Sequence, residues 1–478
     1  MNLTRKERNS CMSKPSVFKN LIGDRTFYKH VLAVALPIMI QNGITNFVSL
    51  LDNIMVGRVG TTEMTGVAIA NQLIFVFNLC IFGCVSASGI FTAQFYGSGD
   101  HKGVADTMRF KLYSGLVLLA CGVGIFAVFG KPLVNLYLLG EGSAADAMQS
   151  LTCGTQYLYI MLIGLLPFVL VQCYAGTLRE TGETFVPMVA GIIAVLVNLL
   201  FNWILIFGKF GAPALGAAGA AIATVISRYV EAVIVIAWTH LHKAKNLFAV
   251  SLFQTSKVPF KLVRSIILKG MPLMVNELFW AIGVAALAQC YSFRGQHVVA
   301  AVNISSTISN LFNVVHLALG SSVSIIIGQL LGAGKMEEAV DRDRKLIAFS
   351  CGCCFVIGAV MFVIAPLFPQ IYNTTDDVRT LAAQIIRILA VYMPFGAFLH
   401  ASYFTLRTGG KTIVTFLFDS VFICCISFPA AYLLSHMTAL PIVPLYAAVQ
   451  SLDLIKCVIG FILVKKRVWV NNIIGATK

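Results

Sequence analysis

The chain has few charged residues for its length. Only 12% of its 478 residues are Asp, Glu, Lys or Arg, whereas 58% are hydrophobic. This composition leaves too little polar surface to cover the apolar side chains in water, which excludes a soluble multidomain protein. Apolar runs of about 20 residues, the length that crosses a bilayer as a helix, recur along the chain. We therefore predict an all-α membrane protein with twelve transmembrane helices, starting near residues 31, 65, 112, 155, 186, 213, 266, 299, 346, 382, 412 and 441.

Several catalytic and binding motifs are also missing. The sequence contains no H-E-x-x-H or G-x-S-x-G motif, so we do not expect an enzyme. The stretch TLRTGGKT ends like a phosphate-binding loop, but Thr405 stands where the first glycine of G-x-x-x-x-G-K-[ST] is required, which argues against ATP as the energy source. The thirteen cysteines lie mostly in apolar runs without histidine partners at metal spacing. We expect no cofactor, and no metal beyond a transiently bound Na⁺.

Acidic residues are scarcer than basic ones, 20 against 35. Most Lys and Arg residues fall in the first 29 residues and in alternate predicted loops, which is the positive-inside pattern. We predict a multi-pass protein of the cell membrane with both termini in the cytoplasm. The amino-terminal segment has no small-residue cleavage site after an apolar core and is not expected to be a cleaved signal peptide. The basic loops fit anionic lipid headgroups, so the expected partner is the bilayer and not nucleic acid.

The chain repeats itself. A shift of 235 residues aligns Leu36-Pro37 with Met271-Pro272 and Gly97–Gly99 with Gly332–Gly334, and TLRETGET matches TLRTGGKT at a shift of 228. Each half would hold six helices, and because six is even, the halves should form two bundles related by a parallel repeat. The predicted division is an N-terminal segment 1–28, a first lobe 29–239, a linker 240–265, a second lobe 266–465 and a tail 466–478.

The repeated glycine motifs are typical of tight turns between helices. We predict that Gly97–Gly99 and Gly332–Gly334 end the second helix of each half, and that the arginine of each TLR stretch, Arg179 or Arg407, caps the last carbonyls of the fourth. Charged pairs near the start of the third helices have the same structural interpretation; they are Asp106/Arg109 and Asp341/Arg344.

These segments resemble the multidrug and toxic compound extrusion (MATE) transporters. The resemblance rests on ALPIMIQN, LLDNIMVGRVG, AQFYGSGD and LRETGETFVPM in the first half, and on GMPLMVNE, IGQLLGAG and LRTGGKT in the second. Their order and duplication cover essentially all of the chain beyond residue 28. The resemblance implies a two-lobed bundle that exports amphipathic, often cationic, small molecules in exchange for Na⁺ or H⁺.

Polar residues inside the first-half spans are candidates for cation coupling. Asp52, Asn198, Asn202 and Thr224 are predicted at a similar depth, where their oxygens could form a cage for Na⁺ or a relay for H⁺. In the resembled family the position of Asn202 is typically a second aspartate, so the amide removes one negative charge and weakens a Na⁺ site. The alternative is that Asp52 pairs with Arg58 and the asparagines bond between helices.

The second half contains another set. Glu277 is a further candidate for cation coupling, although the family carboxylate usually lies one turn further from the proline, where this chain has Trp280. A buried carboxylate or a histidine such as His316 could exchange protons, and hydrogen bonds to neighbouring helices are the alternative. The candidates for substrate binding or proton relay are Gln172, His400 and Asp419.

Two i, i+3 pairs, Arg228/Glu231 and Asp453/Lys456, are predicted to neutralise themselves on one helix face. The leading hypothesis is a monomeric, cation-coupled antiporter for small molecules. The alternatives are a flippase for lipid-linked sugars, which would share the two-lobed plan, and a receptor or scaffold, which would be expected to carry a soluble domain.

Overall fold

The computed structural model describes residues 21–57, 60–138 and 144–475, and this part of the chain is helical without a β-strand. The long helices before the linker are α1 (Arg25–Gly57), α2 (Thr61–Gly97), α3 (His101–Tyr137), α4 (Ala144–Glu180), α5 (Phe185–Phe207) and α6 (Ala217–Leu241). A short helix, α7 (Leu247–Ser251), lies in the linker.

The helices after the linker are α8 (Phe260–Ser292), α9 (Gln296–Gly332), α10 (Met336–Ile364) and α11 (Asp376–Thr408), with a 3₁₀ turn η2 (Phe368–Ile371) between the last two. The next helical stretch contains two π-helical segments and consists of α12 (Thr412–Phe416), η3 (Leu417–Val421), η4 (Ile423–Ser427) and α13 (Phe428–Met437). The last stretch is α14 (Ile442–Ser451) followed by α15 (Asp453–Lys465).

Within the described residues, eleven helices are long and apolar enough to cross a membrane, and α1 is a further helix of 33 residues. The predicted all-helical, multi-pass membrane protein is thus confirmed, but several predicted starts lie too far along the chain. Helix α3 begins at His101 and not at 112, and α10 begins at Met336 and not at 346. The reason is that the first turns of these helices carry charged residues, which a search for apolar runs leaves out.

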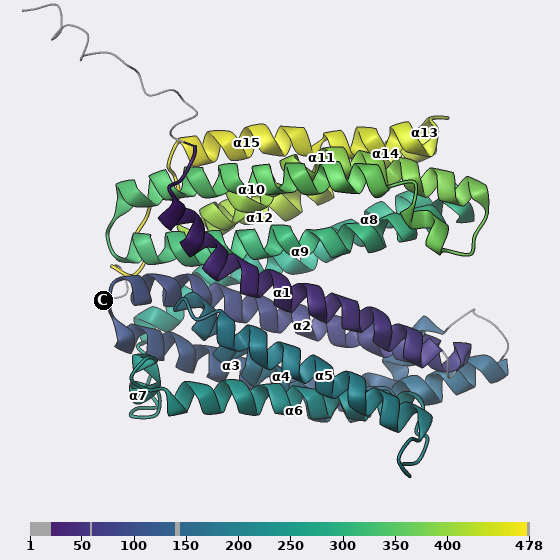
Figure 1. Ribbon diagram of the computed structural model, residues 1–478, viewed down its shortest axis with the longest axis horizontal. Helices are drawn as coiled ribbons and strands as arrows, with labels where there is room; N and C mark the ends of the chain where they lie inside the picture. Colours follow the sequence, from purple (N-terminus) through teal and green to yellow (C-terminus); the bar gives the residue numbers. More distant parts are fainter. Residues whose placement is uncertain (1–20, 58–59, 139–143, 476–478) are drawn as a thin grey trace, which may run out of the picture.

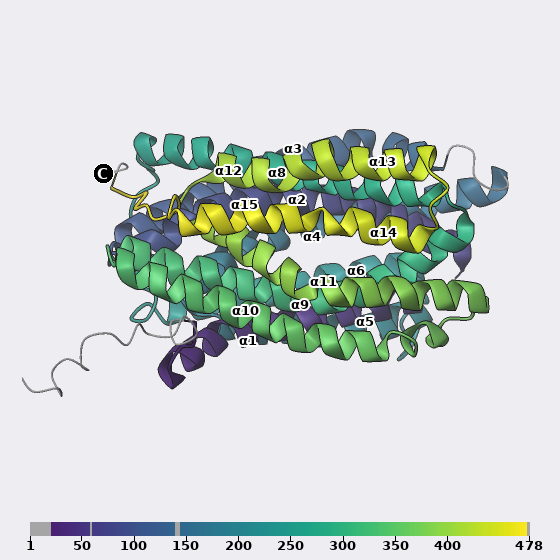
Figure 2. The same ribbon diagram turned by 90° about the horizontal axis from the view of Figure 1, so that it is seen from above.

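The long helices run side by side along a common direction in both views (Figures 1 and 2). In Figure 1 the first-half helices lie below and the second-half helices above, and α1 crosses obliquely between them. Helix α2 packs on α3 and α4, and α9 packs on α10 and α11. Contacts between the halves are made chiefly by α2, which packs against α8 and α9, and by α1, which packs against α5 and α9.

Helices α2 and α9 cross closely at the ends where they terminate, which we call the terminal end of the molecule. A Cβ added at Gly97 would lie 1.9 Å from the carbonyl oxygen of Gln329, and one added at Gly332 would lie 1.9 Å from that of Gln94. Both contacts are backbone against backbone. The two contacts are reciprocal under the 235-residue shift, because it carries Gly97 to Gly332 and Gln94 to Gln329. Glycine is required at both positions because the helices touch there.

The predicted glycine turns are confirmed. Helices α2 and α9 end at Gly97 and Gly332, and the glycines two residues later, Gly99 and Gly334, both have φ of 75°. The predicted arginine caps are wrong. Arg179 donates through Nη2 to Oε1 of Gln41 on α1 at 2.8 Å. The guanidinium of Arg407 lies against aromatic rings of its own helix, 6.0 Å from the Tyr403 centroid and 5.6 Å from that of Phe404.

Candidate functional site

The four first-half candidates lie together between α1, α5 and α6. Asn202 donates through Nδ2 to Oδ1 of Asp52 at 2.6 Å and to Oδ1 of Asn198 at 3.0 Å. The amide of Asn198 lies 3.2 Å from the hydroxyl of Thr224, which also donates to the carbonyl of Ala220 at 3.0 Å. The two asparagines meet Asp52 because they are one turn apart on α5, which packs against both α1 and α6.

One oxygen in this cluster has no partner. Oδ1 of Asn202 is buried without a hydrogen bond, although buried polar atoms are nearly always satisfied. If the amide of Asn198 is turned over, its nitrogen faces the two carboxylate oxygens of Asp52 at 3.1 and 3.2 Å and its oxygen accepts from Thr224 at 3.2 Å. The cluster therefore offers a carboxylate surrounded by amide donors and one free amide oxygen, a set that can bind a proton or a small hard cation.

Two other first-half residues do not belong to this cluster as described. Gln172 is half-buried on α4 and makes no hydrogen bond with the four residues. Arg58, the alternative partner of Asp52, lies outside the described residues.

A second polar cluster lies where α8, α11, η3 and α15 meet. Lys456 on α15 lies 3.2 Å from Oδ1 of Asp419 on η3. Asn276 on α8 donates to the other carboxylate oxygen of Asp419 at 3.3 Å and lies 3.3 Å from the hydroxyl of Tyr403. Ser420 in turn donates to Oδ1 of Asn276 at 2.7 Å. The π-helical segment η3 carries both Asp419 and Ser420 toward Asn276, and such segments often occur at functional sites.

Lys456 therefore pairs with Asp419 and not with Asp453, as the i, i+3 spacing had predicted. Oδ2 of Asp453 accepts instead from Gln450 at 2.9 Å. The corresponding prediction for Arg228 is also wrong, since the described residues contain no ion pair between it and Glu231. The guanidinium of Arg228 lies 5.0 Å from the centroid of Phe168. In both cases tertiary contacts offer the cation a better partner than its own helix.

The remaining second-half candidates lie near this cluster. His316 and His400 stack with their centroids 5.4 Å apart. His316 bonds to Asn313 at 3.3 Å and His400 to the carbonyl of Gly396 at 3.1 Å, as the alternative of hydrogen bonding predicted. Glu277 is half-buried next to Asn276, and no hydrogen bond or ion pair joins its side chain to another described residue.

Sequence reasoning missed a buried ion pair in the first half. The side chain of Lys111 on α3 is fully buried, contacts the carboxylate of Glu180 and lies 3.1 Å from the hydroxyl of Thr177. At the corresponding place in the second half, Thr405 donates to Asp343 at 2.6 Å. Lys111 was overlooked because the predicted span began at residue 112; a charged residue next to an apolar run was the available signal.

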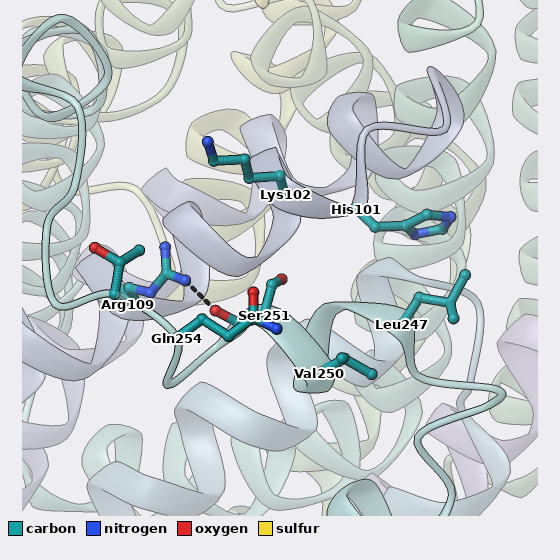
Figure 3. A pocket seen from close by; sticks show the side chains of 8 residues that line it. His101, Lys102, Arg109, Leu247, Val250, Ser251 and Gln254 are labelled. Carbon is teal, nitrogen blue, oxygen red and sulfur yellow. Dashed lines mark hydrogen bonds between the residues drawn. The ribbon is translucent and has the colours of Figure 1, made fainter.

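The linker is fixed to the first half by Arg109. Its Nε donates to the carbonyl of Leu252 at 2.7 Å, and its two terminal nitrogens contact Asp106 and the carbonyl of Ser251 (Figure 3). A surface pocket of about 490 Å³ opens beside this contact and is also lined by His101 and Lys102. Because each guanidinium nitrogen of Arg109 already has a protein partner, we interpret this pair of residues as structural, as the sequence predicted.

Comparison with known proteins places this geometry in a wider group. The chain is 27% identical over 426 residues to the multidrug resistance protein NorM of Vibrio cholerae, covering 87% of this chain and 90% of that protein. It is 26% identical over 372 residues to a probable multidrug resistance protein NorM of Idiomarina loihiensis, covering 78% of each.

Solved structures of similar fold include an outward-facing multidrug resistance MATE family transporter, with a TM-score of 0.84 at 18% identity over 94% of this chain and 97% of that one. A Vibrio cholerae MATE transporter, VcmN, matches with a TM-score of 0.83 at 18% identity, over 94% and 98% of the two chains. The MatE family model matches residues 37–204 and again residues 272–433, two segments whose first residues are the prolines that the 235-residue shift aligns. With more than half of its length matched, and in both halves, the chain belongs to the MatE family, as its sequence motifs predicted.

Proposed function

We propose that this protein is a cation-coupled antiporter that exports amphipathic, often cationic, small molecules by alternating access. Family membership supports this proposal, as do the relatives named as multidrug resistance proteins. In this proposal the two halves are six-helix lobes related by a parallel repeat, and they rock against each other around sites near the middle of the membrane. The protein acts as a monomer in the cell membrane with both termini in the cytoplasm.

The Asp52 cluster is the observation that carries the proposal. A carboxylate inside a spanning helix is costly, by about 2.5–3.5 kcal/mol on insertion scales, and such residues usually mark ion pathways. Asp52 has no cationic partner among its recorded contacts, which are amide groups from α5. A carboxylate held by neutral donors can bind and release a cation without breaking an ion pair.

We propose H⁺ as the ion that this cluster favours. Asp52 supplies the only carboxylate of the four residues, and the Asn202 nitrogen, not its oxygen, faces that carboxylate. A Na⁺ ion prefers several oxygen ligands with enough negative charge to offset its lost hydration, so binding would require the amide to turn and would still leave a single charge. A proton requires only a carboxylate oxygen.

In the second half we propose that Glu277 is the exchangeable carboxylate. Lys456 already neutralises Asp419 at 3.2 Å, so Asp419 has less reason to take up a second cation. His400 stacks on His316 beside this cluster and can relay a proton between it and the substrate path.

The test is efflux of a fluorescent cationic dye from everted vesicles, driven separately by imposed H⁺ and Na⁺ gradients. We expect Asp52→Asn to abolish coupled efflux while the protein still inserts, since removing an intramembrane charge does not impair insertion. Asp376→Asn is the matched control, because this carboxylate is 92% exposed at the start of α11 and pairs only with Arg379. Near-normal efflux by Asp52→Asn would refute the role of the cluster.

A further inference from the structure

The segment that follows the last helix turns back into the protein. Helix α15 ends at Lys465, and Arg467 has φ of 55°, a left-handed conformation that non-glycine residues rarely adopt. Nη1 of Arg467 lies 2.8 Å from a carboxylate oxygen of Glu337 on α10, which helps to hold this turn. The turn directs residues 468–475, which we call the tail, across the terminal end.

The tail is buried against both halves. Trp469 is 1% exposed and belongs to an apolar cluster formed by α9, α10, α11 and the beginning of α1. Ile473 and Ile474 are each 3% exposed and belong to a different cluster, formed mainly by α2, α3, α4 and the linker. Gly409 permits the close approach of the tail, because a Cβ there would lie 1.9 Å from the carbonyl oxygen of Trp469. The tail thus has one seat in each half.

Gln94 on α2 joins these parts by hydrogen bonds. Its fully buried side chain donates through Nε2 to the carbonyl of Thr408 on α11 at 3.1 Å and to that of Asn471 at 3.3 Å. Its Oε1 accepts from the backbone N–H of Ile473 at 2.9 Å. From the other side, Asn472 donates to the carbonyl of Leu331 on α9 at 3.2 Å.

The counterpart of Gln94 lacks the tail. Gln329 donates to the carbonyl of Glu180 at 2.9 Å, and Glu180 corresponds to Thr408 at the shift of 228. Each glutamine therefore crosses to the end of the fourth helix of the other half. Only Gln94 has two further bonds to the tail, so the repeat is closed symmetrically and then reinforced on one side.

We propose that the tail is a latch that holds the two halves together at the terminal end. Opening this end separates α2 from α9 and α11, so either Ile473 and Ile474 leave the first-half cluster or Trp469 leaves the other. Gln94 then loses its partners in a buried site, which is unfavourable unless water replaces them. Release of the tail is therefore part of each opening, and the latch sets the fraction of molecules open at this end. This inference rests on the alternating movement proposed above.

The experiment measures the distance between nitroxide labels on an unnatural amino acid at positions 98 and 333, two exposed residues related by the 235-residue shift. Double electron–electron resonance is recorded on the purified full chain, on a chain ending at Arg467 and on Gln94→Ala. Asn471→Ala is the matched control, because only its backbone carbonyl contacts Gln94 and its side chain is exposed.

We expect the full chain and Asn471→Ala to show mainly the short distance. Each lost hydrogen bond is worth roughly a two- to tenfold change in equilibrium constant. The shortened chain and Gln94→Ala should therefore gain a longer distance whose population is about tenfold or more above that of the full chain. Gln94→Ala keeps the whole chain and thus serves if the shortened protein does not fold.

A distance distribution for Gln94→Ala or the shortened chain that matches the full chain overturns the latch. Opening by Asn471→Ala to the same extent as by Gln94→Ala also overturns it, because the effect would not depend on the described contacts. The efflux experiment on Asp52 judges the proposed function separately: loss of coupling in Asp52→Asn together with unchanged distances in Gln94→Ala would leave the antiporter and remove the latch.

Discussion

Replacing Gly332 by alanine should disrupt the crossing of α2 and α9. The added Cβ would lie 1.9 Å from the carbonyl oxygen of Gln94, whereas ordinary contacts begin at 3.4 Å, so the two backbones must separate by about 1.5 Å. Neither atom belongs to a flexible side chain that could rotate away. Overpacking of this kind costs about 1–3 kcal/mol, and the absence of a flexible neighbour places this site at the upper end.

The assay is thermal unfolding of the purified protein in detergent, for which a loss of about 3 kcal/mol corresponds to a decrease in Tm of several degrees. Gly97→Ala should have the same effect, because its Cβ would meet the carbonyl oxygen of Gln329 at the same distance of 1.9 Å. Gly352→Ala is the control: it lies inside α10 with nothing within 4 Å of an added Cβ, and alanine should stabilise the helix there by up to about 1 kcal/mol.

Equal values of Tm for Gly332→Ala and Gly352→Ala would refute the argument that the halves touch at this crossing. A decrease for Gly332→Ala without one for Gly97→Ala would refute the reciprocity of the two contacts.

Three further predictions follow from the polar clusters and the charge pattern. Asn202→Asp adds a second carboxylate beside Asp52 and should introduce Na⁺-stimulated efflux; strong Na⁺ stimulation of the unmodified protein that disappears with Asp52→Asn would contradict this. Lys456→Met leaves Asp419 without its cation and should destabilise the protein by about 3 kcal/mol, seen as a lower Tm that Asp419→Asn in the same chain largely restores; no recovery in the double variant would show that the pair is not the cause. A cysteine at Lys257, in an otherwise unreactive background, should be protected from an impermeant thiol reagent in intact cells, and labelling from outside would reverse the predicted orientation.

The sequence by itself determined the class of the protein and much of its first candidate site. Long apolar runs can only be satisfied as helices in a membrane, and one chain copied twice retains its motifs at a constant shift. Asp52, Asn198, Asn202 and Thr224 could be grouped because depth along a helix follows from residue number at a constant rise. Helix starts were less accurate, since charged first turns such as those of α3 and α10 extend beyond the apolar run.

Only the tertiary structure decided which charged and polar groups meet. Lys456 could pair with Asp453 on its own helix or with Asp419 on another, and sequence spacing favoured the nearer residue, whereas helix packing places Asp419 at 3.2 Å. Arg179 and Arg407 likewise found partners other than the carbonyls they were expected to cap. The tail gave no sequence signal for its seats, because Trp469 and Ile473 are buried by residues more than a hundred positions away along the chain. Rotation about the helix axes and the contacts between distant segments are set by packing, and packing is not encoded in any one stretch of sequence.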